Sequence, residues 1–271
     1  MEFKHIDDKY FVYTPNKNQI ALTYGSKDFN SKHIVMWSGG TDSTLLLYEL
    51  LQVYGPSNVT AISYQYPWLL STKIEMENRY RELFKSKLKV SDPKLANFNH
   101  AIMKINLDKI SGSMPSFQYG KDVGFIQACS WLLSVPQLCP DDSYVYTGDI
   151  VNDQLDSIKQ TSLYELFDGI SGVIGKNLHL RRPYLLFEKY QVIRKLIEYN
   201  IYDSTWFCEM SNDTDNKICG ICNPCKLHLS ALNTLANIDS DAPELVKLIA
   251  KQQYEKLMNN RTSVKLYDKR G

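Results

Sequence analysis

The chain has 271 residues, of which 44% are hydrophobic and 23% charged, values typical of an ordinary globular protein. A formal net charge of +1 argues against a surface built mainly to bind nucleic acid, which usually needs a strong basic excess. No apolar run approaches the roughly 20 residues that span a bilayer, and the first residues, MEFKHIDDKY, contain no signal-peptide core. We therefore expect a cytoplasmic protein without membrane association, in which clustered cysteines indicate a metal site before disulfides.

Short β-rich runs alternate with helical segments along most of the chain. Residues 1–31 form an N-terminal extension in which FVYT-PNKN-QIALTY (Phe11–Tyr24) resembles a β-hairpin. Strands are predicted at His33–Trp37, Asn58–Tyr64, His100–Asn106, Ser143–Thr147 and Leu178–Arg182, and helices at Ser43–Tyr54, Thr72–Lys89, Asp122–Ser134 and Glu188–Asn200. This alternation predicts an α/β domain over residues 32–200, with a doubly wound, mostly parallel sheet that binds ligands at the carboxyl ends of its strands. Residues 201–271 then supply a cysteine-bearing loop and further helices.

A small polar segment, Ser-Gly-Gly-Thr-Asp-Ser (residues 38–43), joins the first predicted strand of this domain to its helix. Gly39 and Gly40 allow a tight turn and a close approach to a bulky anion. The free N–H groups and positive dipole end of the helix favour phosphate, and the hydroxyls of Ser38, Thr41 and Ser43 add donors. A carboxylate at Asp42 fits either a bound Mg²⁺ or a helix cap. The plainer alternative is a capped polar turn without a ligand.

The second signal is a run of cysteines in the C-terminal region. Cys208, Cys219, Cys222 and Cys225 lie within eighteen residues, and three of them are separated by two-residue gaps. This spacing suits a tetrahedral Zn²⁺ with a structural role, because four sulfurs leave no open coordination position. An iron–sulfur cluster also uses four cysteines, and His228 could replace Cys208 as a ligand, so both alternatives stay open.

The SGGTDS string resembles the SGGxDS pyrophosphate loop of the N-type ATP pyrophosphatases, and it lies in the strand–turn–helix context that this loop requires. The resemblance implies an adenine nucleotide alpha hydrolase-like fold. It also implies that Ser38, Gly39, Gly40, Thr41, Asp42 and Ser43 bind the pyrophosphate portion of ATP. Enzymes of this superfamily cleave ATP between its α and β phosphates, adenylate an oxygen of the substrate and release pyrophosphate.

Three segments together resemble the 7-cyano-7-deazaguanine synthase family: this loop, Leu180-Arg-Arg-Pro183…Phe187-Glu-Lys189, and Thr205-Trp-Phe-Cys208…Cys219-Gly-Ile-Cys222-x-x-Cys225-x-x-His228. The resemblance implies a carbon–nitrogen ligase that uses ATP, Mg²⁺ and ammonia to convert 7-carboxy-7-deazaguanine into 7-cyano-7-deazaguanine through an amide. The product feeds queuosine in tRNA or 7-deazaguanine modification of DNA. It further implies a structural zinc ion, and we expect a homodimer.

The same resemblance assigns individual residues outside the loop. Asp42 and Lys189 are the expected catalytic residues, with Lys189 matching the family's lysine, and Gly148 matches its glycine-containing loop over the nucleotide. Asp149, Asp153 and Lys121 are candidates for binding the substrate or Mg²⁺. The alternatives are a solvated lysine in the first turn of a helix for Lys189 and a cap after a strand for Asp149.

The substrate half departs from the family pattern. The family's Tyr-Pro-Asp-Cys-Arg stretch should fall between Asp153 and Asp168, where the chain reads DQLDSIKQTSLYELFD. A first alternative is therefore a relative that activates a deazaguanine carboxylate but stops at the amide, or transfers it to an amine of a macromolecular acceptor. A second is a non-catalytic zinc-knuckle module that binds nucleic acid. A tRNA-thiolating enzyme would need a cysteine beside the ATP, and Cys129 is the isolated candidate.

Overall fold

The computed structural model describes residues 3–7, 10–13, 33–65, 71–104, 131, 135–136, 138–150, 157–209 and 217–260. The chain forms two compact units. The first unit comprises residues 1–38, 42–69 and 88–187, and the second comprises residues 39–41, 70–87 and 188–271. The chain thus passes twice from the first unit into the second and back before it ends in the second. The predicted domain boundaries at residues 31 and 200 stay predictions.

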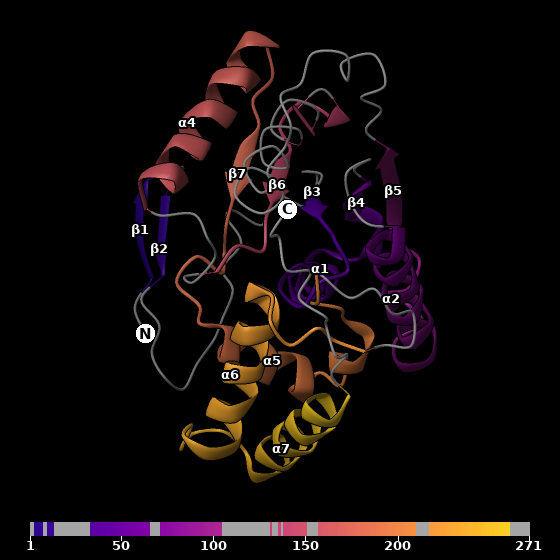
Figure 1. The fold of residues 1–271 in the computed structure, drawn as a ribbon. Coiled ribbons are helices and arrows are strands. Elements are labelled where there is room, and N and C mark those ends of the chain that lie inside the picture. Colours follow the sequence, from indigo (N-terminus) through magenta and orange to yellow (C-terminus); the bar gives the residue numbers. More distant parts are fainter. Residues whose placement is uncertain are drawn as a thin grey trace, which may run out of the picture. The chain divides into compact units, whose positions relative to one another are not determined.

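The first unit contains a five-stranded sheet. Its strands are β3 (His33–Met36), β4 (Val59–Gln65), β5 (Asn99–Lys104), β6 (Tyr144–Tyr146) and β7 (His179–Arg181). They lie in the order β5-β4-β3-β6-β7, and every neighbouring pair is parallel (Figure 1). The first strand of this sheet, β3, therefore lies in its middle. The chain then adds β4 and β5 on one side before it returns to add β6 and β7 on the other. This is the predicted doubly wound α/β fold, and its topological switch point lies between β3 and β6.

Burial explains why the strands form where they do. Val35, Val59, Ala61 and Val145 are fully buried, as expected for a parallel sheet whose strands read as continuous apolar runs. Helix α1 (Thr41–Tyr54) follows β3 and buries its leucines completely, and a short 3₁₀ turn (Pro56–Asn58) leads into β4. All five predicted strands are confirmed with shifts of one or two residues at their ends.

Helix α4 (Ser157–Val173) packs against β7 and was not predicted from the sequence. It carries Gly169 and Gly172, which weaken the helical signal in the sequence. The helix predicted at Asp122–Ser134 lies outside the described residues, apart from Trp131.

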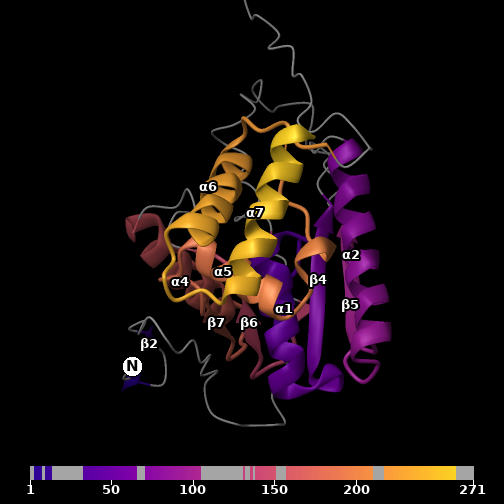
Figure 2. The same ribbon diagram turned by 90° about the horizontal axis from the view of Figure 1, so that it is seen from below.

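The second unit is helical. Helix α2 (Ser71–Ser91) falls mostly within it, and it also contains α5 (Lys189–Glu198), a 3₁₀ turn (Tyr202–Ser204), α6 (Asn223–Asn237) and α7 (Glu244–Asn259). Helices α5, α6 and α7 pack side by side around a shared apolar cluster (Figure 2). A capping box between Glu188 and Gln191 fixes the start of α5, so that Lys189 is its first residue.

The N-terminal residues that the structure describes form a hairpin that the sequence did not predict. Strand β1 (Phe3–Asp7) pairs antiparallel with β2 (Tyr10–Tyr13). The predicted partner strand, QIALTY, lies outside the described residues. Among the described helices, none is both long and apolar enough to cross a membrane.

Candidate functional site

The segment after β3 is closed by hydrogen bonds between its two serines. The backbone N–H of Ser38 donates to Oγ of Ser43 at 3.2 Å, and the two hydroxyl oxygens lie 3.0 Å apart. Helix α1 begins at Thr41, two residues before the predicted start, so Asp42 and Ser43 lie in its first turn. The first unit therefore holds the end of the loop at a helix N-terminus, where backbone N–H groups favour anions.

Gly148 lies directly against this helix start. A Cβ added to Gly148 would come within 3.0 Å of the carbonyl carbon of Asp42 and 3.0 Å of the backbone nitrogen of Ser43. Only a glycine allows the turn after β6 to approach the first turn of α1 so closely. The sequence singled out Gly148 by resemblance alone, and the structure brings it to the loop at the switch point of the sheet.

The glycine turn itself, Gly39 to Thr41, packs within the second unit. Gly39 has a φ of +90°, and an added Cβ would lie 3.1 Å from Cγ of Arg81 and 3.1 Å from the carbonyl oxygen of Glu77. Its own carbonyl oxygen accepts a hydrogen bond of 3.1 Å from the backbone N–H of Trp206. Both the left-handed backbone and the crowding on α2 therefore require glycine at this position.

Lys189 meets this turn within the second unit. Its Nζ donates a hydrogen bond of 2.6 Å to Oγ1 of Thr41, although 148 residues separate them in sequence. Thr41 is buried and Lys189 is half-buried, so the contact differs from that of a fully solvated lysine. The structure thus brings together two of the residues that the sequence assigned to ATP.

An ion pair joins the carboxyl ends of β6 and β7. Nε of Arg182 donates to Oδ2 of Asp149 at 2.8 Å, and the hydroxyl of Thr147 donates to the same oxygen at 2.6 Å. Asp149 was a candidate for substrate or Mg²⁺, whereas Arg182 was quoted in LRRP but given no role. Asp153 and Lys121, the other two candidates, lie outside the described residues.

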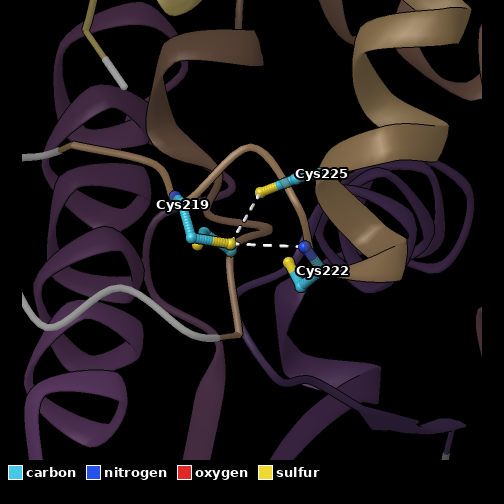
Figure 3. Close-up of side chains that lie close together, drawn as sticks. Cys219, Cys222 and Cys225 are labelled. Carbon is cyan, nitrogen blue, oxygen red and sulfur yellow. Dashed lines mark hydrogen bonds between the residues drawn. The ribbon is translucent and has the colours of Figure 1, made fainter. Parts of the chain in front are cut away.

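The four predicted cysteines converge. Their sulfur atoms all lie within 4.8 Å of one another, and all four residues are buried. Sγ of Cys219 lies 3.8 Å from Sγ of Cys225 and accepts a hydrogen bond from the backbone N–H of Cys222 (Figure 3). Gly220 has a φ of +71°, and this left-handed backbone bends the chain between Cys219 and Cys222. The chain therefore presents four sulfurs to one point.

The distances between the four sulfurs differ between a site for a single metal ion and a site for an iron–sulfur cluster. A tetrahedral ion with metal–sulfur bonds of about 2.3 Å holds its sulfurs ~3.8 Å apart. A four-iron cluster binds each sulfur to a different iron and separates them further. The four sulfurs, which all lie within 4.8 Å of one another, fit a single ion. Hydrogen bonds with Cys208 and Cys222, together with burial, raise the pKa of the Cys225 thiol.

His228 is not part of this cluster. Its Nε2 lies 2.7 Å from the hydroxyl of Tyr202, and its ring stacks on Phe207 with centroids 3.6 Å apart. Burial and the charge of Lys189 lower the pKa of His228 well below its usual value, so the ring is neutral. Cys139 is buried, which raises its pKa to about 12, and Cys129 lies outside the described residues.

No known protein-family profile matches the chain. Many solved structures show distant similarity to the chain, including the following three. The U34-tRNA thiolase NcsA from Methanococcus maripaludis with its [4Fe-4S] cluster shares 12% identity over 86% of this chain and 73% of its own, with a TM-score of 0.42. The NMN synthetase from Francisella tularensis shares 17% over 83% and 86%, with a TM-score of 0.41. The NH3-dependent NAD synthetase from Campylobacter jejuni shares 16% over 87% and 88%, with a TM-score of 0.38. Similarities this distant support no conclusion about activity.

Proposed function

We propose that this protein is an ATP-dependent enzyme that cleaves ATP between its α and β phosphates and adenylates a carboxylate. The observation that carries this proposal is the glycine turn of SGGTDS, whose Thr41 hydroxyl accepts a hydrogen bond from the ammonium group of Lys189. A glycine turn, a helix N-terminus and a lysine are the elements that stabilise a departing pyrophosphate. A polar turn that only capped a helix would need neither the left-handed backbone of Gly39 nor the lysine.

The residues of the loop have separable roles in this reaction. The backbone N–H groups from Gly39 to Thr41 bind pyrophosphate oxygens, and Lys189 neutralises negative charge that develops on the leaving group. The carboxylate of Asp42, with the neighbouring hydroxyls, is a hard oxygen donor set that suits Mg²⁺, which would screen the phosphates when bound. Holding ATP and an acid together converts a slow encounter into a reaction within one complex.

For the acid we propose 7-carboxy-7-deazaguanine, with ammonia as the nucleophile. This finer assignment is supported by the resemblance of LRRP…FEK and of the cysteine segment to 7-cyano-7-deazaguanine synthases. The acid attacks the α-phosphorus and pyrophosphate leaves; ammonia then displaces AMP to give an amide. A second ATP adenylates the amide oxygen, and loss of AMP and a proton gives the nitrile.

A second candidate reaction ends at the amide, or joins the activated acid to an amine on a macromolecule. The specific observation that favours it is helix α4, which occupies most of the stretch where the resembled family has Tyr-Pro-Asp-Cys-Arg. A helix that reads SIKQTSLYELF lacks the residues of that stretch, and under this second candidate the acid or its fate differs from the family's. The homodimer and the cytoplasmic location stay predictions.

We also propose that the four cysteines hold one structural Zn²⁺. Zinc prefers four sulfurs in a tetrahedron, and four protein ligands leave no position for substrate. The cysteines belong to the apolar cluster that includes Met76, Trp206 and Leu229, so the ion would hold α2, α6 and the intervening loop together within the second unit.

The test is incubation with ATP, Mg²⁺, ammonium and 7-carboxy-7-deazaguanine, with nucleotides separated by chromatography and the acid followed by mass spectrometry. We expect AMP and pyrophosphate only when the acid is present, and at least ~10²-fold less with Asp42→Ala. A nitrile mass supports the synthase, whereas an amide or conjugate supports the second candidate. Accumulation of ADP and orthophosphate as the main products would contradict the proposal.

A further inference from the structure

Arg182 is a buried cation whose guanidinium is only partly hydrogen-bonded by the described residues. Its side chain is 1% exposed, and among these residues it forms an ion pair through Nε with Oδ2 of Asp149. Nη1 and Nη2 are both buried, and neither has a hydrogen-bond acceptor in the part of the chain that the structure describes. These two nitrogens carry four N–H donors. A buried arginine with most of its donors unused is uncommon, because each unmade hydrogen bond is unfavourable.

The surroundings hold Arg182 in a defined orientation. The hydroxyl of Thr147 fixes the carboxylate of Asp149, and the guanidinium lies over the ring of Tyr164 at 5.7 Å. Two residues further along the chain, the hydroxyl of Tyr184 donates to the buried carboxylate of Glu49 on α1 at 2.5 Å. The segment that carries Arg182 is therefore anchored to the same helix that begins at the loop.

The geometry of the ion pair is not that of a purely structural one. A structural arginine–carboxylate pair usually engages two guanidinium nitrogens with two carboxylate oxygens. Here one oxygen of Asp149 takes Nε and Thr147, and no described residue offers an acceptor to the Nη edge of Arg182. Arg182 directly follows β7, and Gly148, next to Asp149, touches the start of α1. This is the edge of the sheet where ligands of doubly wound folds bind.

We propose that Nη1 and Nη2 of Arg182 bind an oxyanion of the reaction, namely the carboxylate of the acid that is adenylated, and that Asp149 is the positioning residue that orients them. This inference rests on the proposed adenylation. An ATP phosphate is the other source of the same chemistry. The pairing with Asp149 leaves the site close to neutral, which suits a singly charged planar carboxylate better than a polyphosphate. Nη1 and Nη2 present one N–H each side by side, and these two parallel donors match the two oxygens of one carboxylate.

The experiment compares Arg182→Lys, Arg182→Gln and Asp149→Asn with the wild type. Pyrophosphate release gives KM values for 7-carboxy-7-deazaguanine and ATP, and calorimetry gives the affinity for this acid and for the α,β-methylene analogue of ATP with Mg²⁺. We expect Arg182→Lys to raise KM for the acid at least ~10-fold, because a lysine keeps the charge but loses the planar fork. Affinity for the ATP analogue should stay within about twofold. Asp149→Asn should raise KM for the acid less, and should add little to Arg182→Lys in the double variant.

A matched control is Arg194→Gln. Arg194 is an arginine of the second unit whose Nε and Nη1 pair with Glu198 and Asp239, so its removal should change neither KM nor binding. An unchanged KM for the acid in Arg182→Lys would overturn the inference. Weaker binding of the ATP analogue with an unchanged KM for the acid would also overturn it, and would assign the oxyanion to ATP. Should both Arg182 variants fail to fold, Asp149→Asn decides by the same two readouts.

The two proposals fail separately. Wild-type protein that binds the acid without releasing pyrophosphate would overturn the proposed adenylation, while the calorimetric comparison with Arg182→Lys still decides the role of Arg182. Wild-type protein that releases pyrophosphate, with a KM for the acid that Arg182→Lys leaves unchanged, would overturn only the inference. Wild-type protein that neither binds nor turns over the acid would overturn both.

Discussion

Replacing Gly148 with alanine tests whether the close approach of the turn after β6 to the start of α1 matters for the reaction. The backbone of Gly148 does not have a positive φ, so alanine can adopt its conformation and the effect of the change is purely steric. The new Cβ would lie 3.0 Å from two backbone atoms at Asp42 and Ser43. Carbon atoms prefer separations of about 3.5–4.0 Å, so the two segments must move apart by roughly 0.5–1 Å.

The expected consequence is large for activity and moderate for stability. Overpacking of this kind costs about 1–3 kcal/mol of the free energy of unfolding. A misplacement of about 1 Å in a site that depends on orientation can lower the rate ~10²-fold. We therefore expect the rate of AMP formation by Gly148→Ala, measured with ATP, Mg²⁺ and the acid, to be lower by about this factor. Its melting temperature should fall by only several degrees.

Gly169→Ala is the matched control. Gly169 lies within α4, and an added Cβ there would meet no atom within 4 Å. Alanine in a helix interior is more favourable than glycine by about 0.5–1 kcal/mol, so this variant should be slightly more stable and fully active. Wild-type AMP formation by Gly148→Ala would refute the idea that the turn after β6 sets the position of the nucleotide loop.

Three further predictions concern other parts of the chain. Lys189→Met should lower AMP formation at least ~10²-fold while Lys247→Met on α7 leaves it unchanged; equal activities would show that the contact with Thr41 is incidental. Elemental analysis should find one Zn²⁺ per chain. The Cys222→Ser variant should lose both the metal and the fold of the second unit, because structural zinc supplies on the order of 10 kcal/mol of apparent folding free energy. A wild-type protein that is stable without metal would refute this prediction. Burial lowers the pKa of His33 from 6.5 to about 4. As pH falls from about 6.5 to 4, the unfolded chain therefore binds a proton at His33 and the folded chain does not. The free energy of unfolding should fall over that range by up to about 3 kcal/mol. Urea titrations should show a shallower pH dependence for His33→Phe, and an unchanged one would assign the acid sensitivity to other groups.

Much of the sheet could be predicted from the sequence because each strand is a short apolar run next to a strong turn signal. The run before Gly39 and the Gly55-Pro56 stop are local patterns, and local patterns set where parallel strands begin and end. The cysteine cluster was predictable for the same reason, since two-residue gaps bring sulfurs together within one turn of backbone. The contact between Lys189 and Thr41 could be suggested only by resemblance, because 148 residues separate them.

What could not be predicted depends on contacts between distant segments. Helix α4 was missed because Gly169 and Gly172 lower its local propensity, whereas packing against β7 decides its formation. Arg182 was visible in LRRP, but its burial and its pairing with Asp149, 33 residues earlier in the chain, were not.

Two hydrogen bonds of Trp206 connect the cysteine cluster to the glycine turn within the second unit. The backbone N–H of this residue holds the carbonyl oxygen of Gly39, while its indole Nε1 donates to the carbonyl oxygen of Cys208 at 2.8 Å. Trp206 thus links the backbone of one cysteine of the cluster, through its indole, to the turn that we assign to pyrophosphate, through its own backbone N–H. If the cluster holds zinc as we propose, loss of the ion would leave the carbonyl oxygen of Cys208 without a fixed position and would loosen the turn through Trp206, so the proposed ATP chemistry would depend on the zinc supply.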